Sequence, residues 1–335
     1  MKKPKPLSNR PKLVVIGGGT GSFTLLSEFK RWTDQLTAIV NMADDGGSSG
    51  ELRDELGVLP PGDIRQCLVA LSNYPKARDM FSYRFGGQGK LKGHSVGNIV
   101  LSALELQTGS FNEAVAILAD FMHITGRVVP VSLEKHALVM QDGDKIIRGE
   151  QKIARHTIKQ PDARVWLEPD AVINPTAKKA IIQADMVVIA PGNLYGSLLP
   201  ALSVNGMVKS LKKTKAKVVM VTNLVNKPNQ TYNWHVLDYL KKIEQYIGPV
   251  VDTVIYNSKL PDKNLLARYA EDNELPVLID EARLQHQGVR FIGANLVADK
   301  IFAQDPNDTA IKRTLIRHDA KALRTILEDL LINKT

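Results

Sequence analysis

The sequence predicts an α/β protein built on a doubly wound, mostly parallel sheet, and three observations support this fold class. Short runs of β-branched and aliphatic residues alternate with segments of helical spacing. A glycine turn joins the first apolar run to the first helical segment. Hydrophobic residues make up 44% of the 335 residues, which is enough for a sizeable core. Alternating strands and helices are typical of βαβ units, which place helices on both faces of a parallel sheet.

The expected elements follow one another along the chain. A buried strand at 13–16 leads through the glycine turn into a helix at about 22–32, and a second strand follows at 36–40. Later strands are predicted at 186–189, 218–221 and 253–255, with helical segments at about 197–213 and 230–246. We therefore expect a single Rossmann-like domain over residues 12–330.

Two stretches interrupt this alternation. Residues 64–124 have nearly continuous helical spacing and predict a helical insertion. Residues 128–168 predict a small β excursion of short strands, with a hairpin at Asp142-Gly143, a dipeptide that favours tight turns. Neither a low-complexity linker nor an internal repeat separates these stretches from the rest, so the boundaries are soft and the pattern fits one composite domain and two domains equally; we adopt the single domain. Residues 1–11 form a basic tail.

Composition and charge exclude several classes of protein. No segment approaches the roughly 20 apolar residues that a membrane helix needs, and no signal-peptide core follows the basic N-terminus. The single cysteine, Cys67, excludes an internal disulfide, so we expect a cytoplasmic protein. The net charge of +9 is concentrated in the tail and at helix ends, where lysines favour the helix dipole. A nucleic-acid partner is therefore disfavoured relative to a small phosphate-bearing ligand.

The glycine turn after the first strand is the first candidate site. Glycines let backbone N–H groups approach a ligand, and a helix N-terminus adds partial positive charge, so the turn predicts phosphate binding. The predicted contacts are Gly18, Gly19, Thr20 and Gly21. The pattern is neither G-x-G-x-x-G nor a Walker A loop, and the second strand ends at Asn41 instead of an acidic residue, which disfavours a dehydrogenase. A plain turn in which Thr20 or Ser22 caps the helix is the structural alternative.

A polar loop at 41–50 follows the second strand, at the edge where doubly wound sheets bind ligands. Its predicted contacts are Asp44, Asp45, Gly46, Ser48 and Ser49. Asp44 and Asp45 could hold Mg²⁺ or accept hydrogen bonds from a sugar or base, whereas an Asx turn is the structural alternative. The sequence establishes no cofactor, and Mg²⁺ is the ion with which these carboxylates are compatible.

Further candidates lie at the starts of other predicted helices. Gly192, Asn193 and Ser197 follow a buried strand and are expected to bind a second phosphate or carboxylate. Asp63 is expected to be an N-cap, with Arg65 beside it reaching a phosphate.

Two other groups of candidates remain. Asn98 begins another helix together with His94 and Ser95 and is a candidate for ligand contact. Tyr269 and Arg317 could bracket a uracil ring and its phosphates, although core packing explains Tyr269 equally well.

Taken together, these runs resemble the YvcK/CofD-like proteins over about residues 13–330. The resemblance rests on the runs at 17–21, 43–50, 60–65, 83–85, 93–98 and 126–130. One branch of that family is 2-phospho-lactate transferase, which builds a deazaflavin coenzyme from a nucleotide-activated lactate with Mg²⁺. The other comprises the gluconeogenesis factors of bacteria, which are associated with cell shape and wall synthesis and bind UDP-sugars. The runs at 43–50, 60–65 and 316–319 are more similar to the second branch.

This resemblance implies a UDP-sugar-binding regulatory protein that affects central carbon metabolism, with a nucleotide sugar as its ligand and a homodimer left open. The alternative is a transferase that moves a phospholactyl group from a nucleotide donor to a deazaflavin alcohol. Two positions depart from the family pattern N-L-M-T-Q-P-G-E-T, because Asn229 replaces its glycine and Gln230 its glutamate. The loop usually read as G-P-G-S-L-Y-T-S also departs, being Ala190 to Ser197 here. The lost glutamate puts a carboxylate-dependent reaction step in doubt, and no catalytic residue is assigned.

Overall fold

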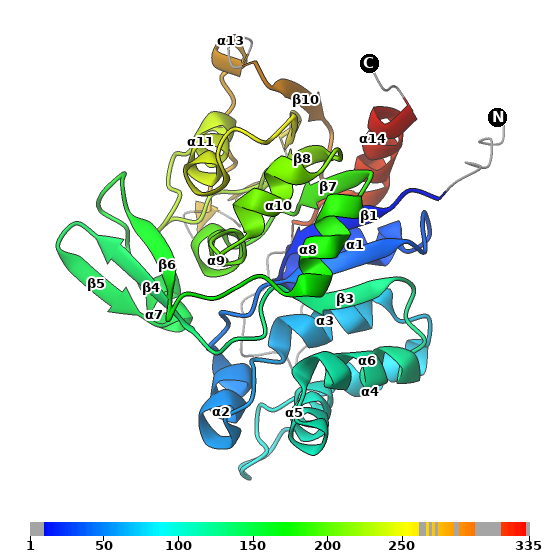
Figure 1. Ribbon diagram of the computed structural model, residues 1–335. Coiled ribbons are helices and arrows are strands. Elements are labelled where there is room, and N and C mark those ends of the chain that lie inside the picture. The colour runs from blue at the N-terminus through cyan, green and yellow to red at the C-terminus, as the bar shows by residue number, and fades with distance from the viewer. Residues whose placement is uncertain are drawn as a thin grey trace.

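The structure is a computed structural model that describes residues 10–260, 266–267, 270–271, 274–284, 288–298 and 316–332. Its main sheet has seven parallel strands in the order β10-β9-β8-β7-β1-β2-β3 (Figure 1). The strands are β1 (Leu13–Gly17), β2 (Leu36–Val40), β3 (Arg127–Pro130), β7 (Met186–Ile189), β8 (Lys217–Val221), β9 (Thr253–Asn257) and β10 (Arg290–Ala294). The winding reverses at β1, which lies between β2 and β7, so the doubly wound prediction is confirmed.

Helices cover both faces of this sheet, which is why β1 and β7 are continuous buried apolar runs. One layer contains α1 (Gly19–Phe29), α3 (Gly62–Leu71) and α14 (Ala320–Ile332), which contact one another through α1. The other layer contains α8 (Pro175–Gln183), α10 (Met207–Lys213) and α11 (Val236–Ile247) (Figure 1). The predicted helix at 197–213 is divided into η1 (Leu194–Leu198), α9 (Leu199–Leu202) and α10.

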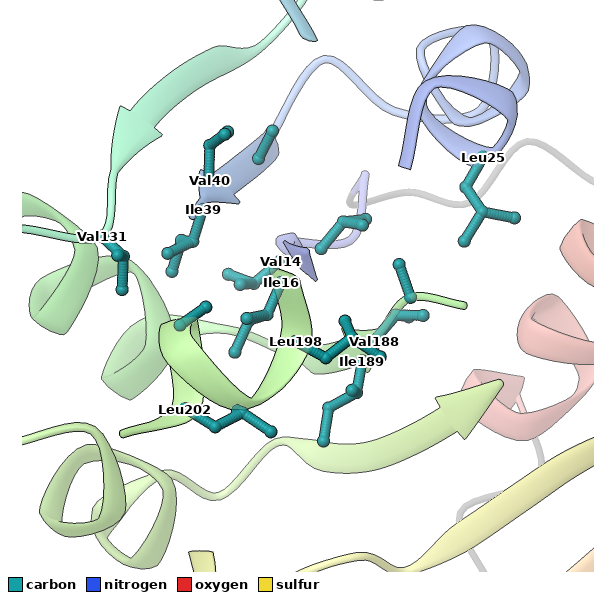
Figure 2. Close-up of a cluster of buried hydrophobic side chains, with 14 of the residues drawn as sticks. Val14, Ile16, Leu25, Ile39, Val40, Val131, Val188, Ile189, Leu198 and Leu202 are labelled. Atoms are coloured by element: carbon teal, nitrogen blue, oxygen red, sulfur yellow. The ribbon is translucent and has the colours of Figure 1, made fainter. Parts of the chain in front are cut away.

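A cluster of buried aliphatic side chains joins the two halves of the winding at β1 (Figure 2). Leu198 and Leu202 point from η1 and α9 toward Ile16 of β1 and Ile189 of β7. Burying each such side chain contributes roughly 1.5–3 kcal/mol. This packing holds the carboxyl ends of β1 and β7 side by side, and the loops that follow them begin at those ends.

Every regular element between β2 and β3 is a helix, as predicted for residues 64–124. This segment contains α2 (Gly47–Leu56), α3, α4 (Pro75–Ser82), α5 (Val96–Thr108) and α6 (Phe111–Phe121). The interpretation of 41–50 as loop throughout was wrong, because α2 begins at Gly47 and ends against Gly57 in the left-handed conformation. Helix α2 contains two glycines and two serines, which have low helix propensity, and only two apolar side chains. Neither propensity nor apolar spacing therefore indicated this helix.

The β excursion forms a separate antiparallel sheet of β4 (Ala137–Asp142), β5 (Lys145–Arg148) and β6 (Arg164–Glu168). Its predicted hairpin is confirmed, because Asp142 pairs with Lys145 across the turn. The excursion starts later than predicted, since β3 pairs in parallel with β2 and belongs to the main sheet. Two further short helices are α7 (Glu150–Arg155), between β5 and β6, and α13 (Glu281–Leu284).

In the part of the chain that the structure describes, no helix is both long and apolar enough to span a bilayer.

Candidate functional site

A cavity of about 600 Å³ opens beyond the carboxyl ends of β1, β2 and β7. Ligands of doubly wound sheets bind where the strand order reverses, and this cavity lies at that point. Its walls are the loops after these three strands, the first turns of α2 and α3, helix α7, and the segment 223–231. Its volume is in the range of small-molecule sites.

Most of the predicted contact residues line this cavity. They are Gly18, Gly19, Thr20, Gly21, Asp44, Gly46, Ser48, Ser49, Arg65, Asn98, Gly192, Asn193, Ser197 and Arg317. Asp45 contacts α7 instead, as described below, and Tyr269 lies outside the described residues. Residues from six separate parts of the sequence, at 18–21, 44–49, 65, 98, 192–197 and 317, therefore meet in one place.

The glycine turn is the first turn of a helix. Helix α1 begins at Gly19, three residues earlier than expected, and Gly18 is its N-cap without any side-chain cap, so neither Thr20 nor Ser22 caps it. Gly19 has φ +63°, a conformation that favours glycine. A Cβ on Gly21 would overlap the carbonyl oxygen of Pro191, so glycine is required where α1 meets the loop after β7.

Asp63 belongs to the site, and its predicted capping role was wrong. The N-cap of α3 is Pro61, and Asp63 lies in the first turn. Its Oδ1 accepts a hydrogen bond from the Gly19 N–H at 3.0 Å. Burial, together with the negative charge of Asp44, raises the pKa of Asp63 to about 7. The carboxylate thus joins α3 to the glycine turn and faces the cavity.

The two adjacent aspartates have different partners. Asp44 lines the cavity, and its Oδ1 accepts from the Gly46 N–H at 3.0 Å. Burial raises the pKa of Asp44 despite that bond. Asp45 accepts from the N–H groups of Glu150 and Gln151, both at 2.8 Å, and so satisfies the first turn of α7. Within the described ranges, no group of three or more His, Cys, Asp or Glu side chains is arranged to hold a metal ion.

Replacing Asp45 with asparagine should therefore affect folding more than ligand binding. The amide has one oxygen for two N–H donors, so we expect the free energy of unfolding to fall by about 0.5–2 kcal/mol, as for a lost helix cap. Urea denaturation measures this loss of stability. Calorimetric titration with the ligand of the cavity should show a smaller loss of ligand affinity for Asp45→Asn than for Asp44→Asn. An unchanged stability combined with lost affinity would contradict the assignment.

Glu150 and Lys227 were not predicted, and both line the cavity. Burial raises the pKa of Glu150 to about 8, and the negative charges of Asp44 and Asp45 add to this effect. Burial lowers the pKa of Lys227, and the carboxylate of Glu150 opposes that change. No local motif marks Glu150, because the antiparallel sheet brings α7 to the cavity from a distant part of the chain.

A buried polar network holds three helices around the cavity. The Arg65 Nε donates to the Asn98 Oδ1 at 2.9 Å, and the Asn98 Nδ2 donates to the Ser48 Oγ at 3.0 Å. Gly97 lets the Arg65 side chain pack closely, since a Cβ there would lie 2.6 Å from the Arg65 Cδ. Helices α2, α3 and α5 are therefore connected through side chains that also line the site.

The side chains of Asn229 and Gln230, the two residues that depart from the family pattern, form hydrogen bonds with the C-terminal part of α7 and the residue after it. The Gln230 Nε2 donates to the Ile153 carbonyl oxygen at 3.0 Å. The Asn229 Nδ2 donates to the carbonyl oxygens of Ala154 and His156, both at 2.9 Å. An ionised glutamate at position 230 has no hydrogen to donate, so the amide suits this contact. These hydrogen bonds join α7, which lies between two strands of the antiparallel sheet, to the segment that follows β8 of the main sheet.

Comparisons with known proteins show the family and support the fold. The model of the family described as "2-phospho-L-lactate transferase CofD" matches residues 13–297. The "Gluconeogenesis factor" of Bacillus subtilis is 36% identical over 332 residues, covering 97% of this chain and 99% of the relative. That of Listeria monocytogenes is 36% identical over 319 residues, covering 90% and 97%. The crystal structure of protein BH3568 from Bacillus halodurans superposes with a TM-score of 0.87 at 34% identity, covering 95% of this chain and 100% of that one. The chain therefore belongs to the CofD family and, within it, to the gluconeogenesis factors.

Proposed function

We propose that this protein is a cytoplasmic regulatory protein that binds a nucleotide sugar, specifically a UDP-sugar. The observation that carries the proposal is the cavity at the reversal of the strand order, where glycine turns, carboxylates and basic side chains converge. Backbone N–H groups at a helix start suit phosphate, and carboxylates suit sugar hydroxyls. A nucleotide sugar carries both kinds of group.

The first turn of α1 and the side chain of Arg65 are proposed to face the diphosphate. Asp44 would then face hydroxyl groups of the ligand. Mg²⁺ fits the donor set, because Asp44 and Asp63 supply hard oxygen ligands beside the proposed phosphate position. When bound, the ion would neutralise phosphate charge, and the two carboxylates would hold it.

A regulatory role is favoured over phospholactyl transfer by two observations. Relatives of nearly full length carry the name gluconeogenesis factor, which supports a role in central carbon metabolism. The amides of Asn229 and Gln230 serve structural contacts where the family pattern has glycine and glutamate. Effects on cell shape and wall synthesis follow if the bound ligand is a wall precursor. A phospholactyl transferase is the second candidate, favoured by the description of the matching family model.

A thermal-shift panel tests the proposal. We expect UDP-sugars to raise the melting temperature more than ATP or NAD, because a ligand at a hundred times its Kd stabilises the folded state by about 2.7 kcal/mol. The panel is run with and without Mg²⁺. An equal or larger shift with NAD would contradict the ranking. Repeated turnover of a lactyl-diphospho-nucleoside with a deazaflavin alcohol would establish the transferase instead.

A further inference from the structure

Three side chains beside the cavity form a connected chain of hydrogen bonds. Ser48 lies in the first turn of α2 and lines the cavity. Its Oγ lies 3.0 Å from the Nδ1 of His94, and the Nε2 of His94 lies 3.1 Å from the Oε2 of Glu51. Ser48 and His94 are buried, whereas the side chain of Glu51 is 59% exposed. The order of groups is hydroxyl, imidazole, carboxylate.

The partners determine where the protons lie. An ionised carboxylate only accepts hydrogen bonds, so Glu51 places a hydrogen on the Nε2 of His94. In the neutral imidazole, Nδ1 then carries the lone pair and accepts the hydroxyl hydrogen of Ser48. The Asn98 Nδ2 donates to the same Oγ and fixes its orientation. The Ser48 hydroxyl therefore points its hydrogen at a base, and Ser48 lines the cavity.

We propose that Ser48 is a nucleophile, with His94 as its general base and Glu51 as the residue that positions His94. Serine is activated in proteins when its hydroxyl is hydrogen-bonded to a base and a further group, here a carboxylate, orients that base. Ser48 also lies in the first turn of a ten-residue helix, whose N–H groups favour negative charge that develops there. The site would act on an electrophilic phosphorus.

The chemical step balances with the side chains of the site and the proposed ligand. The Ser48 Oγ attacks one phosphorus of a phosphoanhydride and forms an O–P bond, and the hydroxyl proton passes to His94 Nδ1. The bridging P–O bond breaks, and its electron pair leaves with the second phosphate. For the natural ligand, this step rests on the proposed nucleotide-sugar function. The reactivity of Ser48 itself does not, so the two can be tested separately.

Diisopropyl fluorophosphate is the probe, because its phosphorus is electrophilic and fluoride leaves with the electron pair of the broken P–F bond. We expect one adduct per chain, located at Ser48 by peptide mass spectrometry. Ser49 is an internal control, since it lies in the same turn and cavity wall but its side chain bonds to Asp44. Absence of an adduct, or equal labelling of Ser49, would overturn the proposal.

Variants test the roles of the other two residues. His94→Asn should slow labelling about a hundredfold or more, the usual loss for a general base. Glu51→Gln should slow it about tenfold at an unchanged melting temperature, and because Glu51 is exposed this variant decides the outcome if His94→Asn folds poorly. His123→Asn is the matched control, because His123 is exposed with φ +44°, which asparagine tolerates. Undiminished labelling in a folded His94→Asn variant would refute the role of His94 as the base, and undiminished labelling in Glu51→Gln would refute the positioning role of Glu51.

Protection by the nucleotide sugar separates this inference from the proposed function. We expect a UDP-sugar to slow the labelling of Ser48, because the UDP-sugar and the fluorophosphate probe would occupy the same cavity. Labelling that depends on His94 but is indifferent to every nucleotide sugar would uphold the nucleophile and refute the proposed ligand. Tight nucleotide-sugar binding to a chain that the probe cannot label would uphold the ligand and refute the nucleophile.

Discussion

Gly21→Ala is expected to abolish nucleotide binding and to lower the free energy of unfolding by about 1–3 kcal/mol, the usual range for overpacking. The new Cβ would overlap the carbonyl oxygen of Pro191, which is backbone and cannot rotate away as a side chain can. Either α1 or the loop after β7 must therefore move. Both line the cavity, so a shift at their contact changes the site from two sides.

Gly192→Ala is the matched control, because it lies on the other side of the same contact. The nearest atom to its added Cβ would be the Gly18 carbonyl oxygen at 3.8 Å, an ordinary van der Waals distance. Its stability should stay within about 0.5 kcal/mol of the wild type. Urea denaturation and calorimetric titration compare the two variants. If Gly21→Ala were as stable as Gly192→Ala and bound the nucleotide as the wild type does, close packing of α1 against this loop would not be needed for the site.

The free energy of unfolding should fall as pH rises from about 4 to about 7, and Asp63→Asn should remove much of that fall. The pKa of Asp63 is about 7 in the folded state against 3.8 for the ordinary group. Between these values the folded chain binds a proton that the unfolded chain has released, so stability decreases with increasing pH. Asparagine keeps an oxygen for the Gly19 N–H and cannot ionise.

The expected gain of Asp63→Asn over the wild type is therefore largest above pH 7, where it approaches about 4 kcal/mol as an upper bound. Denaturant unfolding without ligand, at several pH values between about 5 and 8, measures it. Asp54→Asn is the control, because the Asp54 side chain is 67% exposed and the variant should keep the wild-type profile. A stability difference between Asp63→Asn and wild type that is independent of pH would show that Asp63 does not titrate in this range.

The strands around the site could be predicted from the sequence because their signal is local. β2 and β7 have the predicted bounds, and β1 exceeds its prediction by one residue. A strand buried on both faces needs a continuous apolar run, and that run is visible without knowledge of its neighbours. The glycine turn was identified for the same reason, since four glycines in five residues indicate close approach of backbone. These features determined the fold class and the location of the cavity.

Only the tertiary structure decided what each carboxylate does. Asp44 and Asp45 are adjacent and chemically identical, yet one faces the cavity and the other satisfies α7. Asp63 has the sequence context of a cap, but its carboxylate meets the glycine turn because α1 and α3 pack together. Helix propensity belongs to each residue type and apolar spacing to residues near in sequence, so both can be read along the chain. A carboxylate's partner and pKa depend on burial and on charges that folding brings from distant segments, such as α7 with Glu150.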